Sequence, residues 1–227
     1  MLRGMPLETL DYRTGEKPVA SIIVMHGLGA DATDFVPFAR EIDLSAVGPV
    51  RWVFPAAPVR PVTLNNGMRM RAWYDILTLD FTPRLEDEAG LRASRLEVQA
   101  LIDREIAEGV PASRIVLGGF SQGCAMSLLA GLRAPERLGG ILGMSGYLPL
   151  AATTAAERSA ANAGLPIFLA HGRYDQMIHI DRGRETQAAL AALGYPVEWH
   201  EYPMEHSVCP EEVVAIGNWL RKVLAPA

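Results

Sequence analysis

Cysteine is scarce in this chain of 227 residues, which contains only Cys124 and Cys209. Two cysteines are too few for the disulfide framework of a small secreted domain, which favours a reducing compartment. Long apolar runs are also lacking: no segment approaches the roughly 20 apolar residues that span a bilayer, and the N-terminus has no apolar signal-peptide core. The sequence therefore predicts a cytoplasmic protein without stable membrane insertion.

Basic runs are missing as well. The 21 basic and 26 acidic residues give a formal net charge of -5 and are spread along the chain without a long block of either sign. This pattern argues against nucleic acid as a partner. The pattern His-Glu-X-X-His is absent, and the cysteines and histidines are scattered. The sequence therefore predicts no metal site and no cofactor.

Apolar residues, in contrast, are plentiful. The chain is 49% hydrophobic and 21% charged, as globular proteins are, and its length favours one domain over residues 1–227. Short apolar runs alternate with longer segments of helical period, which is typical of a mostly parallel sheet with helices on both faces. Strands are expected near residues 7–12, 19–25, 51–54, 115–120, 140–145, 166–171 and 197–202, and helices near 87–108, 122–133, 182–193 and 211–224.

Two segments fit no regular element. Residues 56–81 are rich in Pro, Asn and Gly but carry too many apolar side chains for a simple solvated loop. We expect this segment to fold over another part of the molecule. Residues 151–165 are rich in alanine and polar side chains, which predicts an irregular surface excursion.

The sequence Gly-Phe-Ser-Gln-Gly at residues 119–123 fits the Gly-X-Ser-X-Gly elbow and lies between an apolar strand and a helical segment, as that motif requires. The turn is sharp, so both flanking residues must be small enough for strand and helix to approach closely. Gly119 and Gly123 meet that requirement. We therefore predict that Ser121 is a catalytic nucleophile on an α/β-hydrolase fold.

A serine hydroxyl needs a histidine to accept its proton and a carboxylate to hold that histidine in the correct tautomer. In this fold the chain order is serine, acid, histidine. His206 follows the last predicted strand, and Asp175 lies in the turn after the strand before it. The competing Asp181 falls in the next helix, where capping alone explains a carboxylate. The sequence therefore predicts a triad of Ser121, Asp175 and His206.

The other histidines have structural interpretations. His26 precedes the serine and breaks the chain order. His200 lies within a predicted strand, and His179 lies at the surface or at a helix start. We expect His171, at a strand exit, to be a buried hydrogen-bonding residue.

Acyl transfer also requires two backbone N–H groups that face the oxygen of the tetrahedral intermediate. The residue after the nucleophile, Gln122, should supply one donor, and Leu28, in the loop after an early strand, the other. The same loop fits a dinucleotide pattern, with Gly27, Gly29 and Ala32. That alternative requires a carboxylate at the end of the second strand, and residues 51–55 contain none.

Four motifs, HGLGAD, GGFSQG, HGRYDQ and EYPMEHSVCPEE, together resemble the phospholipase/carboxylesterase family, which includes acyl-protein thioesterases. The segment RAWYD at residues 71–75 is similar to its bacterial carboxylesterase branch. The resemblance implies the same triad and the same oxyanion donors. It also implies a serine carboxylesterase that acts on short- to medium-chain acyl esters, with lysophospholipids or acyl thioesters as alternative substrates, and a homodimer as the oligomeric state. A catalytically inert binding protein is the non-enzymatic alternative, which the complete triad disfavours.

The apolar segment at residues 68–79 is our candidate for the wall of an acyl pocket, with Trp73, Met70 and Leu77 as substrate-binding residues. A purely structural role in the core is the competing interpretation of this segment. Cys124 stands where family members usually have glycine. We expect it to pack as a small buried side chain on the first turn of the helix; a redox-sensitive thiol is the functional alternative.

Overall fold

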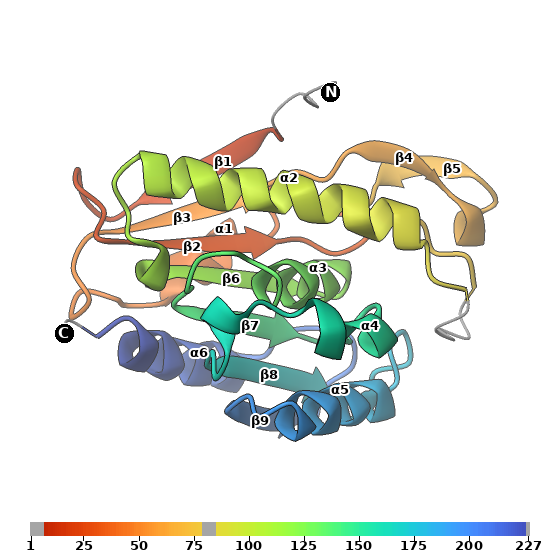
Figure 1. Ribbon diagram of the computed structural model, residues 1–227. Helices are drawn as coiled ribbons and strands as arrows, with labels where there is room; N and C mark the ends of the chain where they lie inside the picture. The colour runs from red at the N-terminus through yellow and green to blue at the C-terminus, as the bar shows by residue number, and fades with distance from the viewer. Residues whose placement is uncertain (1–6, 79–84, 226–227) are drawn as a thin grey trace.

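The computed structural model describes residues 7–78 and 85–225 and has a seven-stranded sheet at its centre (Figure 1). The strand order is β1-β3-β2-β6-β7-β8-β9. β1 pairs antiparallel with β3, and the other neighbouring strands are parallel. The strands are β1 (Thr9–Arg13), β2 (Ala20–Met25), β3 (Val50–Pro55), β6 (Ile115–Phe120), β7 (Gly140–Met144), β8 (Ile167–Gly172) and β9 (Val197–Tyr202).

Helices cover both faces of this sheet (Figure 1). One face carries α2 (Glu88–Ala107), α3 (Gln122–Gly131) and α5 (Ile180–Ala192), and the other carries α1 (Val36–Glu41) and α6 (Pro210–Val223). Each layer encloses its own apolar cluster: Leu91 and Leu101 of α2 belong to one, and Phe38 and Trp219 to the other. The predicted α/β-hydrolase architecture is therefore confirmed.

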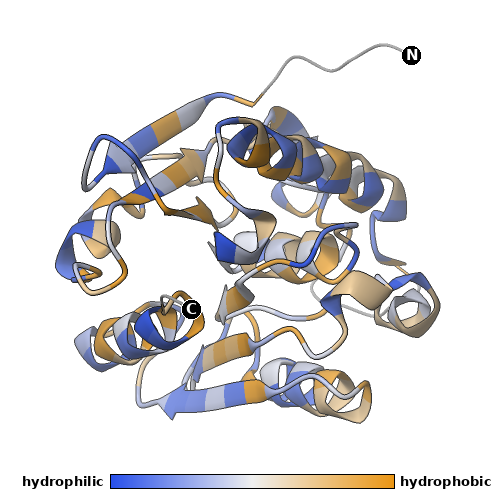
Figure 2. Cartoon of the chain, turned by 60° about the vertical axis from the view of Figure 1, so that its left-hand side comes forward, coloured by the Kyte–Doolittle hydropathy of each residue, from blue (hydrophilic) through white to orange (hydrophobic). Residues whose placement is uncertain are grey.

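The central strands are buried along nearly their whole length, as their apolar runs predict, and only Phe120 at the end of β6 is half-buried. Every residue of β2, β3 and β8 is buried. Hydrophobic residues concentrate on these strands, whereas α2, α5 and α6 alternate between apolar and polar residues around the helix (Figure 2). Parallel strands place all their carboxyl ends at one edge, and the loops that leave this edge carry the predicted site residues.

The described part of the segment at residues 56–81 forms a hairpin and then enters the core. The hairpin is β4 (Val59–Val62) and β5 (Met68–Arg71), joined through the short 3-10 helix η1 (Thr63–Asn65). Ala72, Trp73 and Tyr74 follow it and are buried. The prediction that this segment folds over another part of the chain is confirmed, since the Trp73 amide bonds the side chain of Gln122 at the start of α3.

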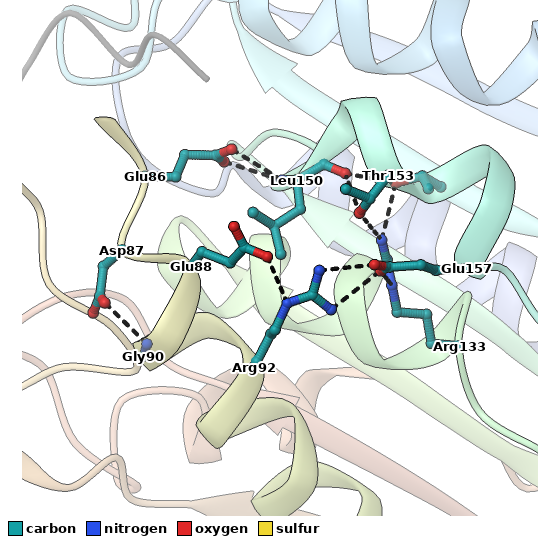
Figure 3. A network of polar contacts seen from close by, with 10 residues as sticks. Glu86, Asp87, Glu88, Gly90, Arg92, Arg133, Leu150, Thr153 and Glu157 are labelled. Carbon is teal, nitrogen blue, oxygen red and sulfur yellow. Dashed lines mark hydrogen bonds and ion pairs between the residues drawn. The ribbon is translucent and has the colours of Figure 1, made fainter. Parts of the chain in front are cut away.

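The prediction for residues 151–165 is right about the surface position, since most of these residues are exposed or half-buried, and wrong about the irregular structure. This segment forms α4 (Ala151–Glu157) and a 3-10 helix, η4 (Ala160–Asn162); another 3-10 helix, η3 (Ala112–Arg114), precedes β6. α4 is held by ion pairs from distant elements, because Glu157 binds both Arg92 of α2 and the buried Arg133 that follows α3 (Figure 3). Hydrogen bonds from Arg92 and Arg133 lower the pKa of Glu157 to about 2 despite the opposing effect of burial.

Candidate active site

Ser121 lies at a tight turn between β6 and α3, with φ 57 and ψ -117, a backbone conformation that is rare for a residue with a side chain. Its amide donates to Met144 O of β7 at 2.9 Å. The flanking glycines permit the turn: a Cβ on Gly119 would overlap the Gly123 carbonyl, and a Cβ on Gly123 would overlap the Met25 carbonyl. The local sequence thus presents the Ser121 side chain at the carboxyl edge of the sheet, as the elbow motif predicts.

Cys124 lies on the first turn of α3 and is 1% exposed. Its side chain packs against the backbone of Gly143 and Gly146, where a Cβ on either glycine would come within 2.8 Å of the Cys124 sulfur. Burial raises the pKa of the Cys124 thiol to about 12. A buried thiol in its protonated form is unreactive, so the packing role predicted for Cys124 is confirmed.

Asp175 and His206 lie in the loops after β8 and β9 and form a direct pair. His206 Nδ1 lies 2.7 Å from Asp175 Oδ2, and the other carboxylate oxygen accepts hydrogen bonds from the Met177 and Ile178 amides, each at 2.9 Å. Burial alone would raise the pKa of Asp175, but hydrogen bonds from His171, His206 and Ile178 outweigh it and hold that pKa well below its usual range. Asp175 is therefore an anion that orients the imidazole of His206.

His171 is buried next to Asp175 and helps to position it. It is 1% exposed, and its Nε2 lies 2.7 Å from Ile178 O and 3.4 Å from Asp175 Oδ2. A carbonyl oxygen can only accept, so His171 Nε2 carries a proton. The buried hydrogen-bonding role predicted for His171 is confirmed.

A cavity of about 220 Å³ brings the predicted residues together: Ser121, His206, Leu28 and Gln122 all line it. We call it the Ser121 cavity. Asp175 lies behind His206 and does not line the cavity. Asp34 also lines it, and the remaining apolar and aromatic wall comes from segments far apart in the sequence: Ala30, Leu64, Tyr74, Ile76, Phe120, Tyr147, Met177 and Ile178.

Sequence reasoning predicted part of this wall and missed Leu64, Tyr147, Met177 and Ile178. Tyr74 and Ile76 belong to the apolar segment that was predicted as a pocket wall, but the predicted members Trp73, Met70 and Leu77 do not line the Ser121 cavity. Leu79 of that segment lies outside the described residues. Tyr147 and Met177 follow β7 and β8, and no local pattern marks them.

Trp73 is buried and connects the loop that carries Leu28 to the first residue of α3, Gln122. Its Nε1–H donates to His26 O at 2.9 Å, and its amide donates to Gln122 Oε1 at 3.0 Å. The side-chain Nε2 of Gln122 in turn donates to Tyr74 O at 3.0 Å. Trp73 is 0% exposed and does not line the Ser121 cavity.

His26 holds the same loop in its neutral form. Its Nδ1 lies 2.7 Å from Gly27 O, and its Nε2 accepts the Ala57 amide at 3.0 Å. Burial lowers the pKa of His26, which agrees with one ring nitrogen donating and the other accepting. Gly29 N donates to Arg71 O at 2.9 Å, so residues 26–29 are fixed at both ends.

The competing titratable residues lie apart from the cavity. His179 and Asp181 pair with each other at the exposed start of α5, and His200 on β9 pairs with Glu198.

Within residues 7–78 and 85–225, no group of His, Cys, Asp and Glu side chains could hold a metal ion. None of the helices in those ranges has the length and apolar character needed to cross a membrane.

Comparison with known proteins identifies the family. The model of the phospholipase/carboxylesterase family matches residues 12–224. The chain belongs to this family. It is 41% identical over 207 residues to acyl-protein thioesterase 1 of Yarrowia lipolytica, covering 89% of this chain and 91% of that relative. To acyl-protein thioesterase 1 of Mycosarcoma maydis it is 40% identical, with 95% of each chain covered.

A solved structure supports the same family assignment. The crystal structure of Zea mays acyl-protein thioesterase 2 superposes with a TM-score of 0.82 at 30% identity, covering 96% of this chain and 99% of that one. Because the chain belongs to this serine hydrolase family and its relatives are named as thioesterases, the protein is a hydrolase. The relatives named here are eukaryotic, so they support the family, while membership of its bacterial carboxylesterase branch stays a prediction.

Proposed function

We propose that this hydrolase cleaves acyl esters and acyl thioesters through an acyl-enzyme intermediate on Ser121. The observation that carries the proposal is the shared cavity of Ser121 and His206, with the second ring nitrogen of His206 bonded to Asp175. The names of the relatives, acyl-protein thioesterases, favour thioesters beside the short- to medium-chain oxygen esters that the motifs predict.

The charge on Asp175 determines the tautomer of His206. An anionic carboxylate accepts, so Nδ1 of His206 carries the proton and Nε2 is left to receive one. Ser121 Oγ attacks the carbonyl carbon of the substrate while His206 Nε2 takes the hydroxyl proton, and Asp175 stabilises the imidazolium that forms. The tetrahedral intermediate collapses as that proton passes to the leaving oxygen or sulfur. Water, deprotonated by His206, then hydrolyses the acyl-serine and restores Ser121.

The backbone amides of Leu28 and Gln122 are the proposed donors to the oxyanion. Gln122 is the first residue of α3, where an amide has no carbonyl one turn earlier to bond. Leu28 lies in the loop that His26, Arg71 and Trp73 hold. Because donors fixed before the reaction need no reorganisation during it, this hydrogen-bonded frame supports their assignment.

The apolar wall of the Ser121 cavity is the proposed site for the acyl chain. Each buried methylene contributes about 0.8 kcal/mol, so kcat/KM should rise about fourfold per methylene until the wall is filled. Comparison of acetyl, butyryl and octanoyl esters of one alcohol and one thiol measures both the preferred length and the preferred leaving atom.

The experiment that tests the mechanism is labelling with a fluorophosphonate together with burst kinetics on a chromogenic butyryl ester. Labelling should fall on Ser121, and Ser121→Ala should lower kcat by about a thousandfold or more without unfolding the protein. His206→Ala should have a similar effect. An unlabelled Ser121, or a Ser121→Ala variant with normal turnover, would show that the reaction uses another nucleophile.

A further inference from the structure

A second cavity adjoins the Ser121 cavity and shares Asp34, Phe120 and His206 with it. Its volume is about 440 Å³, and we call it the Phe38 cavity. The rest of its wall is formed mainly by α1, the loop after His206 and the start of α6: Phe35, Phe38, Glu41, Val208, Cys209 and Val213. Unlike the Ser121 cavity, it is lined neither by Ser121 nor by the proposed oxyanion donors.

The proposed mechanism divides the substrate between these two cavities. The tetrahedral carbon bears the Ser121 oxygen, the oxyanion, the acyl chain and the leaving group. The first two belong to the Ser121 cavity, whose apolar wall also suits the acyl chain. The leaving atom must lie beside His206, which protonates it, and His206 lines both cavities. A leaving group that extends past His206 therefore enters the Phe38 cavity.

The wall of the Phe38 cavity combines aromatic rings with carboxylates; Phe35, Phe38 and Glu41 line this cavity and not the Ser121 cavity, whereas Phe120 and Asp34 line both. The ring of Phe35 lies 5.6 Å from that of Phe38 and 6.0 Å from that of Phe120, between centroids. Aromatic rings attract ammonium and guanidinium cations. The exposed carboxylates of Asp34 and Glu41 also line the cavity, and no lysine or arginine does. An anionic leaving group would be repelled, whereas a cationic one gains from both features.

We propose that the Phe38 cavity binds the leaving group of the substrate and favours alcohols and thiols that carry a positive charge next to an apolar body. This proposal rests on the proposed function, because it assigns the second half of the same reaction. In its simplest chemical form the preferred leaving group is a thiol or alcohol with an alkylammonium group.

A steric test uses neighbouring valines of α6. Val213 lines the Phe38 cavity, whereas Val214 is 63% exposed, so Val213→Trp obstructs the cavity and Val214→Trp is the matched control. With octanoyl esters, Val213→Trp should lower kcat/KM for a naphthyl leaving group about tenfold or more, and for an ethyl leaving group less than about twofold. Val213→Ala, which enlarges the cavity, should not lower kcat/KM for the naphthyl ester and serves if the tryptophan variant fails to fold.

Deacylation separates the leaving-group site from an acyl site. The leaving group has departed once the acyl-enzyme forms, so Val213→Trp should leave the deacylation rate of the octanoyl-enzyme and the order of preference among acyl lengths unchanged. A changed acyl-length preference with an unchanged leaving-group preference would overturn the assignment, because the Phe38 cavity would then hold the acyl chain. Failure of the proposed function itself gives a different result, since no acyl-enzyme forms on Ser121 at all.

A charge test uses butyrylthiocholine and its uncharged isostere, the butyryl thioester of 3,3-dimethylbutane-1-thiol. The ratio of their kcat/KM values cancels effects of each variant that both substrates share. Glu41→Gln should lower this ratio about threefold and Glu41→Lys about tenfold, and both effects should shrink as salt rises. Glu136→Lys, at an exposed position before β7 and thus at the opposite edge of the sheet, is the control for net charge. A ratio that Glu41→Lys leaves unchanged would overturn the cation preference.

Discussion

Asp175 and Glu212 are two buried carboxyl groups, one before and one after His206 in the chain, and their surroundings differ. Asp175 is 2% exposed, and its oxygens accept from the Met177 and Ile178 amides and from His206. Glu212 is 0% exposed, and neither of its oxygens makes a hydrogen bond of normal geometry within the described residues. Burial therefore does not distinguish an acid that can serve a reaction; the donors around it do.

The two pKa shifts follow from this difference. Hydrogen bonds hold the pKa of Asp175 well below its usual range in spite of burial. Burial raises the pKa of Glu212 to about 8, and the nearby Cys209 amide offsets only part of the effect. Glu212 is the third residue of α6, a position from which a glutamate side chain can face the amide that precedes the helix. Its surroundings thus suit a neutral carboxyl group at a helix start.

The largest expected effect comes from neutralising each acid in turn. Asp175→Asn should lower kcat about 10⁴-fold, because the amide favours the wrong tautomer of His206. Glu212→Gln should leave kcat within about twofold of the wild-type value. Steady-state turnover of a butyryl ester, with circular dichroism to confirm folding, measures both. Equal losses in the two variants would show that the contrast between these acids has no bearing on the reaction.

Trp73 and Trp52 show the same contrast as the two acids: one indole N–H has a hydrogen-bond partner and the other has none in the part of the chain that the structure describes. Both are 0% exposed, but the Nε1–H of Trp73 donates to His26 O, whereas that of Trp52 has no partner within the described residues. Trp73→Phe should lower kcat between about 10- and 100-fold with KM within about twofold, because a misplaced oxyanion loop weakens only the transition state. Trp52→Phe is the matched control and should leave kcat nearly unchanged. A Trp73→Phe variant that instead altered only the acyl-length preference would support the pocket-wall role predicted from sequence.

Much of the fold and the core of the site follow from local sequence. The strands at residues 115–120 and 166–171 are continuous apolar runs, and the elbow glycines permit the close approach of strand and helix that the turn at Ser121 requires. Asp175 and His206 could be chosen because each follows a recognisable strand, and strand ends meet at one edge of the sheet. The helix predicted at residues 87–108 agrees with α2. It begins where predicted, since Asp87 caps the first turn by accepting a hydrogen bond from the Gly90 amide.

What could not be predicted depends on contacts between distant residues. α4 is rich in alanine, the strongest helix former, so its helical structure could have been predicted, but its ion pairs to Arg92 and Arg133 join segments separated by 65 and 24 positions. The wall of the Ser121 cavity converges from separate loops, so Tyr147 and Met177 carry no local signal. The role of Trp73 illustrates a related difficulty: an aromatic residue beside a predicted pocket can face the ligand or pack behind the pocket wall, and composition does not separate these roles.

A smaller effect is expected from the residue beneath Asp175. His171 donates through Nε2 toward Ile178 O and the Asp175 carboxylate. His171→Phe removes the donor and should lower kcat about tenfold, since the loop that orients Asp175 loses a hydrogen bond. His171→Gln retains an N–H donor and should recover part of that loss, which a purely steric role for the ring would not produce. Pre-steady-state acylation rates distinguish the two variants.

The smallest expected effect is a pH-dependent change in stability at Glu212. Its pKa is about 8 in the folded protein against an ordinary value of 4.5. A raised pKa contributes stability that is present below about pH 4.5 and is lost as pH rises toward 8. Glutamine at position 212 cannot ionise. The Tm of Glu212→Gln should therefore be equal to or lower than the wild-type Tm near pH 5, and the Tm of the variant should rise relative to that of the wild type up to pH 8. A Tm difference that stays constant over this range would show that Glu212 ionises normally, and would remove the contrast with Asp175.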